Sequence, residues 1–137
     1  MTLLETELVH LSVGLIMALT IFYFTKSLPL TIFSFLVNFL LDVDHLFDYF
    51  FCFGLNFNLN NFLKGDAFTE SGKVYTLFHA WEWSAVLGLL GLKFQRKIFW
   101  TLALTIFVHL LTDVWTNRMF FSDYSFIFRF IHDFRIR

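Results

Sequence analysis

An acidic motif inside a long apolar segment is the feature that most constrains the fold. Residues 42–48, Asp-Val-Asp-His-Leu-Phe-Asp, place three carboxylates and one imidazole within seven positions. The preceding residues, 28–41, carry no charge, and residues 49–55 are almost entirely apolar. Ionisable side chains are costly at membrane depth and usually mark a functional site there. We therefore expect the other ionisable residues of the apolar segments to be partners of this motif.

The composition of the whole chain agrees with a membrane setting. The 137 residues are 58% hydrophobic and 15% charged, with a mean hydropathy of +0.68. Soluble domains carry about 25% charged residues, so this chain lacks the polar surface of a water-soluble fold. The net charge of -1 gives no sign of nucleic-acid binding, and the single Cys52 excludes an internal disulfide. We expect an integral, multi-pass protein of a bacterial or archaeal plasma membrane, surrounded by the lipid bilayer.

Four apolar segments predict an all-α fold, an integral membrane bundle of four transmembrane helices in a single domain that covers residues 1–137. About 20 apolar residues suffice to cross the hydrocarbon core as a helix. The predicted helices and an amphipathic C-terminal helix in the tail lie at about 8–25, 30–55, 74–92, 97–116 and 123–137. The tail alternates aromatic and basic residues, which is typical of an interfacial helix but also of an ordinary packed element. Residues 56–73 predict an exposed loop with a short interfacial helix around Phe62.

The ionisable residues of the four segments fall at similar depths. The short turns at 26–29 and 93–97 must share one membrane face if the four helices alternate in direction. Counted from these turns at about 1.5 Å per residue, each set of ionisable residues lies roughly 16–24 Å away. Scattered polar residues would rarely coincide in this way, so the sequence predicts that the side chains meet in one layer. The residues of this layer are His10, Asp42, Asp44, His45, His79, Glu82, His109 and Asp113.

Helical spacing predicts which of these side chains share a face. His109 and Asp113 are four residues apart, and His79 and Glu82 are three apart, so each pair lies on one side of its helix. Asp42 and Asp44, in contrast, point apart on a regular helix. Either the helix breaks or kinks near them, or the two carboxylates serve two metal ions.

The residue types in this layer are those of a metal centre. Imidazole and carboxylate ligands suit zinc, manganese or iron. Six or more ligands exceed the four of one tetrahedral zinc ion, so we predict two or three divalent ions, zinc being the first choice. Asp44 and Glu82 are predicted to act as ligands or as the catalytic general base, and Asp48 to orient His45. The alternative is that the charged pairs only neutralise one another inside the bundle.

The spaced motifs resemble those of the membrane-bound metal-dependent hydrolase family, also described as YdjM-like or LexA-binding inner-membrane hydrolases. That family has a histidine in the first helix, a Pro-Asp-x-Asp-His motif, a central histidine block and a late His-x-x-x-Asp motif. The matching residues here are His10, then residues 41–45, then His79, then residues 109–113. Leu41 replaces the proline, and the central His-Arg-Gly-x-x-His-Ser block is reduced to Phe-His-Ala-Trp-Glu-Trp at 78–83, so one ligand is lost or replaced by Glu82. The resemblance implies a metal-dependent hydrolase. A more distant similarity, in ligand pattern, is to zinc-dependent phospholipase C and the single-strand nucleases, which hold a trinuclear zinc site.

The sequence thus predicts a membrane-embedded hydrolase in which metal-activated water attacks a phosphodiester or ester of a lipid or lipid-linked substrate. One alternative is a divalent-cation or proton transporter, and another is a non-catalytic regulatory protein with a degenerate metal site. The halves of the helices near the short turns carry no charged residue, which argues against a continuous ion path. Tyr124 and Arg129 are predicted to reach the mouth of the site, and Arg129 to meet a phosphate. The basic residues do not decide which membrane face carries the site.

Overall fold

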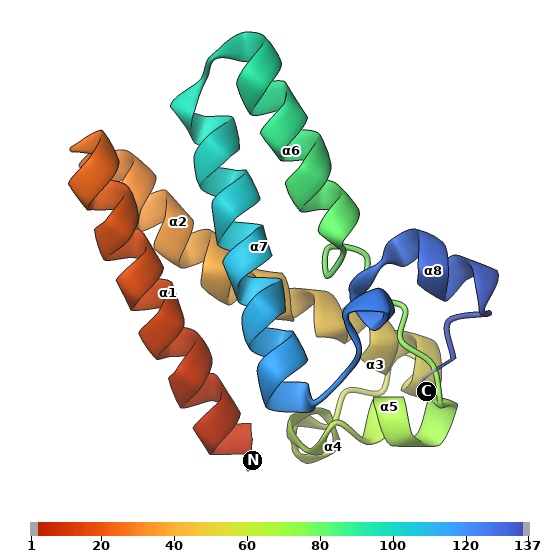
Figure 1. Cartoon of the computed structure of the whole chain (residues 1–137). Coiled ribbons are helices and arrows are strands. Elements are labelled where there is room, and N and C mark those ends of the chain that lie inside the picture. The colour runs from red at the N-terminus through yellow and green to blue at the C-terminus, as the bar shows by residue number, and fades with distance from the viewer. Residues whose placement is uncertain (1–2, 136–137) are drawn as a thin grey trace.

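The computed structural model describes residues 3–135, and its named elements over that range are all helical (Figure 1). The prediction of an all-α fold is therefore confirmed for this part of the chain. Positions 1–2 and 136–137, which belong to the predicted domain and tail, lie outside the described residues. The α-helices are α1 (Leu3–Thr25), α2 (Leu28–Leu40), α3 (His45–Phe53), α4 (Leu59–Lys64), α5 (Asp66–Ser71), α6 (Trp81–Phe94), α7 (Lys97–Asn117) and α8 (Phe126–Ile131). Two 3-10 helices, η1 (Leu41–Asp44) and η2 (Phe121–Tyr124), complete the list.

Three helical stretches are long and apolar enough to cross a membrane, namely Glu5–Thr25, Leu28–Phe53 and Lys97–Asn117. The distribution of side chains fits the same setting. Large apolar side chains cover the outside of these helices, while hydroxyl, imidazole and carboxylate groups are buried between them. This is the reverse of the arrangement in water-soluble proteins, where polar groups are mostly exposed. The structure is compatible with a multi-pass membrane protein.

The third predicted membrane helix is shorter than expected. The sequence predicts a helix over 74–92, whereas α6 begins only at Trp81 and contains 14 residues. Residues 73–80 form no helix, and several of their N–H groups bind side chains rather than helical carbonyls. Tyr75 donates its backbone N–H to Asp48, and Leu77 and Phe78 donate theirs to Asp44. The described residues therefore contain three candidate membrane spans, and the four transmembrane helices of the prediction are not shown.

Helices α1 and α2 form one hairpin and α6 and α7 form another, and the turns of both hairpins lie at the same end of the molecule (Figure 1). The turns are tight, with Lys26 at a φ of 52° and Gln95 at a φ of 53°. Helix α7 packs against α1, α2 and α6, and α1 packs against α2. The short turns therefore share one end, as the alternating topology requires, and the ionisable residues lie toward the other.

Small and polar residues bring these helices close together. Ser34 of α2 and Thr105 of α7 are buried, with their hydroxyl oxygens 2.7 Å apart. A Cβ at Gly14 of α1 would lie 2.5 Å from Nδ2 of Asn38 in α2. Close packing and hydrogen bonds of this kind hold helices together in membranes, where the hydrophobic effect does not drive helix association because the lipid is itself apolar.

The second apolar segment stays helical through the acidic motif but changes from α-helix to a 3-10 turn there, which is the kind of irregularity that the first of the two predicted options requires. Helix α2 ends at Leu40, η1 carries Asp42 and Asp44, and α3 begins at His45. The 3-10 turn changes the angular spacing of successive side chains. Asp42 and Asp44 consequently face different parts of the site.

The polar stretch 56–73 packs against α3, and the tail packs against the segment 73–80 that follows it. The stretch contains α4, which includes Phe62 as predicted, and α5. In the tail, α8 exposes Ile127, Phe130 and Ile131 but buries Arg129, which is only 4% exposed. The helix predicted over 123–137 is thus reduced to the six residues of α8, and Arg129, the one basic residue of α8, belongs to the interior of the protein.

Candidate metal centre

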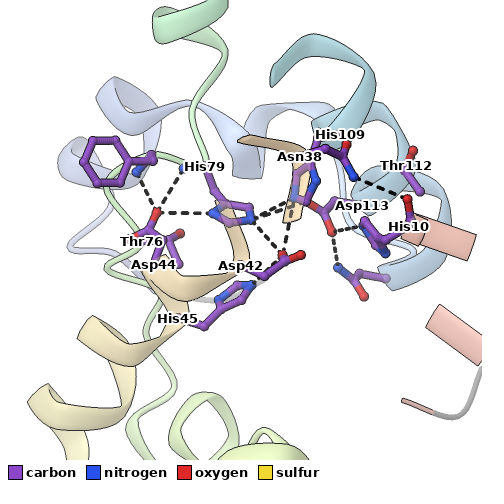
Figure 2. A network of polar contacts seen from close by, with 12 residues as sticks. His10, Asn38, Asp42, Asp44, His45, Thr76, His79, His109, Thr112 and Asp113 are labelled. Carbon is purple, nitrogen blue, oxygen red and sulfur yellow. Dashed lines mark hydrogen bonds and ion pairs between the residues drawn. The ribbon is translucent and has the colours of Figure 1, made fainter. Parts of the chain in front are cut away.

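Seven of the side chains predicted from the sequence converge at one place, where η1, the segment 73–80 and the helices α1 and α7 meet (Figure 2). They come from four distant parts of the chain, and most are buried. The converging residues are His10 on α1, Asp42 and Asp44 on η1, His45 on α3, His79 before α6, and His109 and Asp113 on α7.

Four ligand atoms form the centre of this cluster: Nε2 of His79, Nε2 of His109, Oδ1 of Asp42 and Oδ2 of Asp113. The two imidazole nitrogens lie 3.2 Å apart. Oδ1 of Asp42 lies 3.4 Å from each of them. Oδ2 of Asp113 lies 3.3 Å from His109 and 3.6 Å from His79. All four atoms thus face a common point.

The tautomer of His79 shows why these contacts favour a cation. Nδ1 of His79 lies 3.2 Å from Oδ2 of Asp44, so this nitrogen donates a proton to the carboxylate. In the neutral ring, Nε2 then carries a lone pair, and that lone pair faces the oxygens of Asp42 and Asp113. Two electron-rich atoms at this separation repel each other unless a proton or a metal cation lies between them.

His10 repeats this arrangement on the other side of Asp113. Nδ1 of His10 donates to the carbonyl of Thr6 at 2.9 Å, because a carbonyl can only accept. Nε2 of His10 faces Oδ1 of Asp113 at 3.0 Å. The same oxygen accepts a hydrogen bond from Asn117 at 3.3 Å. One carboxylate therefore faces three imidazoles, His10 through one oxygen and His79 and His109 through the other.

His45 lies at the edge of the cluster. Its Nε2 is 3.8 Å from Oδ1 of Asp42, and its ring centroid is 4.7 Å from that of His79. Asp48, predicted to orient His45, lies 4.0 Å from Nδ1 of that ring. Asp42 thus faces His45 as well as the two central imidazoles.

Asp44, predicted as a ligand or general base, lies behind His79. Its Oδ1 accepts the N–H of Leu77 at 3.0 Å, and its Oδ2 accepts that of Phe78 at 2.6 Å. The N–H and Nδ1 of His79 also approach Oδ2 at 3.2 Å. With both oxygens occupied, Asp44 orients the imidazole of His79, a role that carboxylates often play next to metal ligands.

The structure does not bring Glu82 into the cluster. Its Oε1 accepts hydrogen bonds from the hydroxyl of Ser125 at 2.5 Å and the N–H of Ile127 at 3.1 Å. Its Oε2 accepts the N–H of Phe126 at 3.1 Å. The predicted pairing with His79 requires one continuous helix, but α6 begins at Trp81, so the two residues do not share a helical face.

The charge of the cluster also favours a cation. Asp44, Asp48 and Asp113 are buried and Asp42 is partly buried, whereas Arg129 is the single buried basic side chain among the described residues apart from the histidines. Burial lowers the pKa of Arg129 from its usual value, but an arginine stays protonated. Oδ2 of Asp113 accepts no hydrogen bond from the described residues. A buried carboxylate oxygen without such a bond is costly, and a metal ion would satisfy it.

These groups could hold a metal ion. One set comprises His10, His109 and Asp113, and another comprises Asp42, His79 and His109, each with ligand atoms within 4.8 Å of one another. The two sets share His109, which lies between them, and imidazole with carboxylate is a common ligand combination for transition metals.

A cavity of about 780 Å³ opens onto the cluster. Asp42, His45, His79 and Asp113 form its polar wall, together with His10. Apolar side chains from α2, α3, α4 and the segments around them also line the cavity, among them Phe39, Leu46, Phe62, Leu63 and Met119, and so do the charged residues Glu7 and Lys64. A volume of this size suits a small molecule, and mixed walls of this kind are typical of ligand sites.

Tyr124 and Arg129 also line this cavity, as predicted for the mouth of the site. Tyr124 Oη lies 3.1 Å from Nδ2 of Asn117, and burial raises the pKa of this phenol, which keeps it neutral at pH 7. Arg129 is predicted to meet a phosphate, but two of its nitrogens donate hydrogen bonds within the protein, to the hydroxyl of Thr76 and to the carbonyl of His79.

Sequence reasoning missed Asn117 and Thr76. Asn117 stands four residues after Asp113, so helical spacing could have identified it as a neighbour of that carboxylate. Thr76 lies in an irregular segment and gives no periodic signal.

No family model, curated protein or solved structure matches the chain, so its function has to be inferred from the site.

Proposed function

We propose that this protein is a membrane-embedded metal-dependent hydrolase that acts on a phosphodiester or ester of a lipid-type substrate. The observation that carries the proposal is the arrangement of the four central ligand atoms of His79, His109, Asp42 and Asp113. In a tetrahedral zinc site with bonds of about 2.0–2.1 Å, ligand atoms lie about 3.3–3.4 Å apart. Five of the six separations among the four atoms are 3.2–3.6 Å. A zinc ion fits this geometry, and manganese or iron could use the same ligands.

The flanking histidines support a centre with two or three ions. Asp113 faces His10 through the oxygen that is not directed to the central point, at 3.0 Å. Asp42 faces His45 at 3.8 Å through Oδ1, the same oxygen that faces the central imidazoles. Asp42 and Asp113 would therefore both be available as ligands to more than one ion. This number of ions also offsets the charge of the four carboxylates at the site.

Hydrolysis fits the position of the cavity. Metal ions bound there would activate water and polarise the bond to be cleaved. His45 and Asp42 face the cavity and would contact the substrate's polar group, while Phe39, Leu46 and Leu63 would contact apolar parts of a lipid. Asp44 would act by fixing the tautomer of His79 rather than as a general base.

The membrane setting of the proposal is a multi-pass protein of a bacterial or archaeal plasma membrane. Three helical stretches are long and apolar enough to cross a membrane. We propose α6 as a fourth crossing segment, extended by residues 73–80, because it pairs with α7 along its whole length and exposes Leu89 and Leu92. The resemblance of the spaced motifs to the membrane-bound metal-dependent hydrolases, stated above, supports the same class.

Hydrolysis by the purified protein in proteoliposomes tests the proposal. Fluorescent phospholipid analogues with a cleavable phosphodiester or a cleavable carboxyl ester are supplied to zinc-loaded protein, to chelated protein and to a His109→Ala/Asp113→Ala variant. The proposal predicts cleavage of one analogue only by the zinc-loaded wild type. Divalent-cation flux is measured in the same vesicles. Flux without cleavage of either analogue would contradict the proposal and favour a transporter, and the absence of both would favour a regulatory protein.

A further inference from the structure

His79 is held differently from the other central ligands. His109 and Asp113 lie on a helix of 21 residues, and Asp42 lies on a 3-10 turn continuous with α2. His79 lies in the segment 73–80, which has no regular helix. Its position must therefore be set by contacts with other parts of the chain.

These contacts reach the segment from two sides. On one side, Asp44 accepts the N–H groups of Leu77, Phe78 and His79. On the other side, Arg129 donates from Nη2 to the carbonyl of His79 at 2.8 Å and from Nη1 to the hydroxyl of Thr76 at 2.6 Å. Thr76 and His79 are each 1% exposed. The backbone that carries the imidazole is thus fixed between a carboxylate and a guanidinium.

Arg129 is itself held by the start of α6. The carboxylate of Glu82 accepts bonds from Ser125, Phe126 and Ile127, the residues that begin α8. The N–H of Val74 donates to the carbonyl of Phe134 at 2.9 Å, which joins the end of the tail to the same segment. Glu82 therefore fixes α8, α8 carries Arg129, and Arg129 fixes the carbonyl of His79.

We propose that Arg129, held in place by Glu82, is a positioning residue that sets the metal affinity of the site through His79. The inference rests on the proposed metal centre. Arg129 does not contact the metal ligand's ring: it holds the peptide carbonyl, and Asp44 holds the ring. Hydrogen-bond partners of metal ligands typically contribute 10- to 100-fold to metal affinity, because they hold the ligand in its binding orientation.

Cobalt binding tests this role directly, since Co²⁺ takes zinc sites and its visible absorption reports ligand geometry. The wild type is compared with Arg129→Ala, Arg129→Lys, Glu82→Gln and the control Arg135→Ala, whose side chain is 75% exposed. We expect Arg129→Ala to bind Co²⁺ 10- to 100-fold more weakly with an altered spectrum. Arg129→Lys, which can restore one hydrogen bond, should fall between it and the wild type. Arg135→Ala should match the wild type.

A double-mutant cycle separates positioning from general stability. Because Glu82 acts through Arg129, Glu82→Gln should weaken Co²⁺ binding in the wild type but have little further effect in Arg129→Ala. A folded Arg129→Ala variant with wild-type affinity and spectrum would overturn the inference. If that variant does not fold, Arg129→Lys and Glu82→Gln carry the same test, and wild-type affinity in both would overturn it. A wild type that binds no Co²⁺ would instead contradict the proposed metal centre.

Discussion

The carboxylate of Asp44 lies 3.2 Å from Nδ1 of His79, on the side of the ring away from the nitrogen that faces His109. This relationship assigns different roles to two acidic residues that are only two positions apart. Asp42 directs an oxygen to the central point between the imidazoles, while Asp44 directs both oxygens to the segment that carries His79. The 3-10 turn η1 makes this division possible.

Replacing Asp44 with asparagine should weaken metal binding without removing a ligand. The amide has the size of the carboxylate but lacks its charge and brings its own N–H groups toward the N–H groups of the segment 77–79. We expect zinc affinity to fall about 10- to 100-fold while the number of ions bound at saturation is unchanged. Competition with a chromophoric chelator measures both. Glu70→Gln, at an exposed acidic residue, is the control, and unaltered affinity in Asp44→Asn would contradict the assignment.

Glu82→Gln distinguishes the structural role of this residue from the ligand role predicted from the sequence. If Glu82 only fixes α8, the variant should bind the same number of zinc ions as the wild type when zinc is saturating. A ligand role would instead remove an ion. The metal-to-protein ratio after gel filtration in zinc-containing buffer decides between these outcomes.

Gly14→Ala should destabilise the packing of α1 against α2. The added Cβ would lie 2.5 Å from Asn38, whose amide also donates to the carbonyl of His10 at 3.3 Å. We expect a loss of about 1–3 kcal/mol, typical of overpacking, and a lower unfolding temperature in detergent. Gly88→Ala is a matched control because nothing lies within 4 Å of its added Cβ. Equal unfolding temperatures for the two variants would argue against this helix packing.

Leu63→Trp should separate substrate binding from metal binding. Leu63 lines the cavity, so a larger side chain would reduce the space for an apolar substrate group. We expect slower cleavage of long-chain analogues, a smaller effect on short-chain ones, and unchanged zinc content. Leu59→Trp, on the same helix but not among the residues that line the cavity, is the control. The cavity assignment is refuted if both variants cleave long-chain analogues at the wild-type rate.

Much of the convergence could be predicted from the sequence, because an ionisable residue is conspicuous in an apolar helix and the helical rise is fixed. His10, His109 and Asp113 lie where this counting places them, and the irregular backbone near Asp42 is one of the two options that the spacing of Asp42 and Asp44 on a regular helix predicts. The segment 73–80 could not be predicted in the same way. Its side chains are apolar enough for a helix, and only the tertiary contacts to Asp44 and Asp48 show that its N–H groups are used elsewhere.

The irregular segment 73–80 also explains the other differences between the predicted and the observed site. Because α6 begins at Trp81, Glu82 points to α8 rather than to the side of His79. The tail could be predicted to be amphipathic from its alternation of aromatic and basic residues, but alternation does not show which basic residue is buried. Arg129 can be buried because the carbonyl of His79 and the hydroxyl of Thr76 accept hydrogen bonds from its guanidinium.

The metal content of the purified protein tests the central claim most directly. Wild type and a His109→Ala/Asp113→Ala variant are purified without chelator, equilibrated with zinc, freed of excess metal and measured by elemental analysis. We predict at least one zinc ion per wild-type chain and its loss in the variant, because the two residues supply half of the central ligand atoms. A wild type without stoichiometric metal, or a folded variant that retains it, would contradict the proposed metal centre.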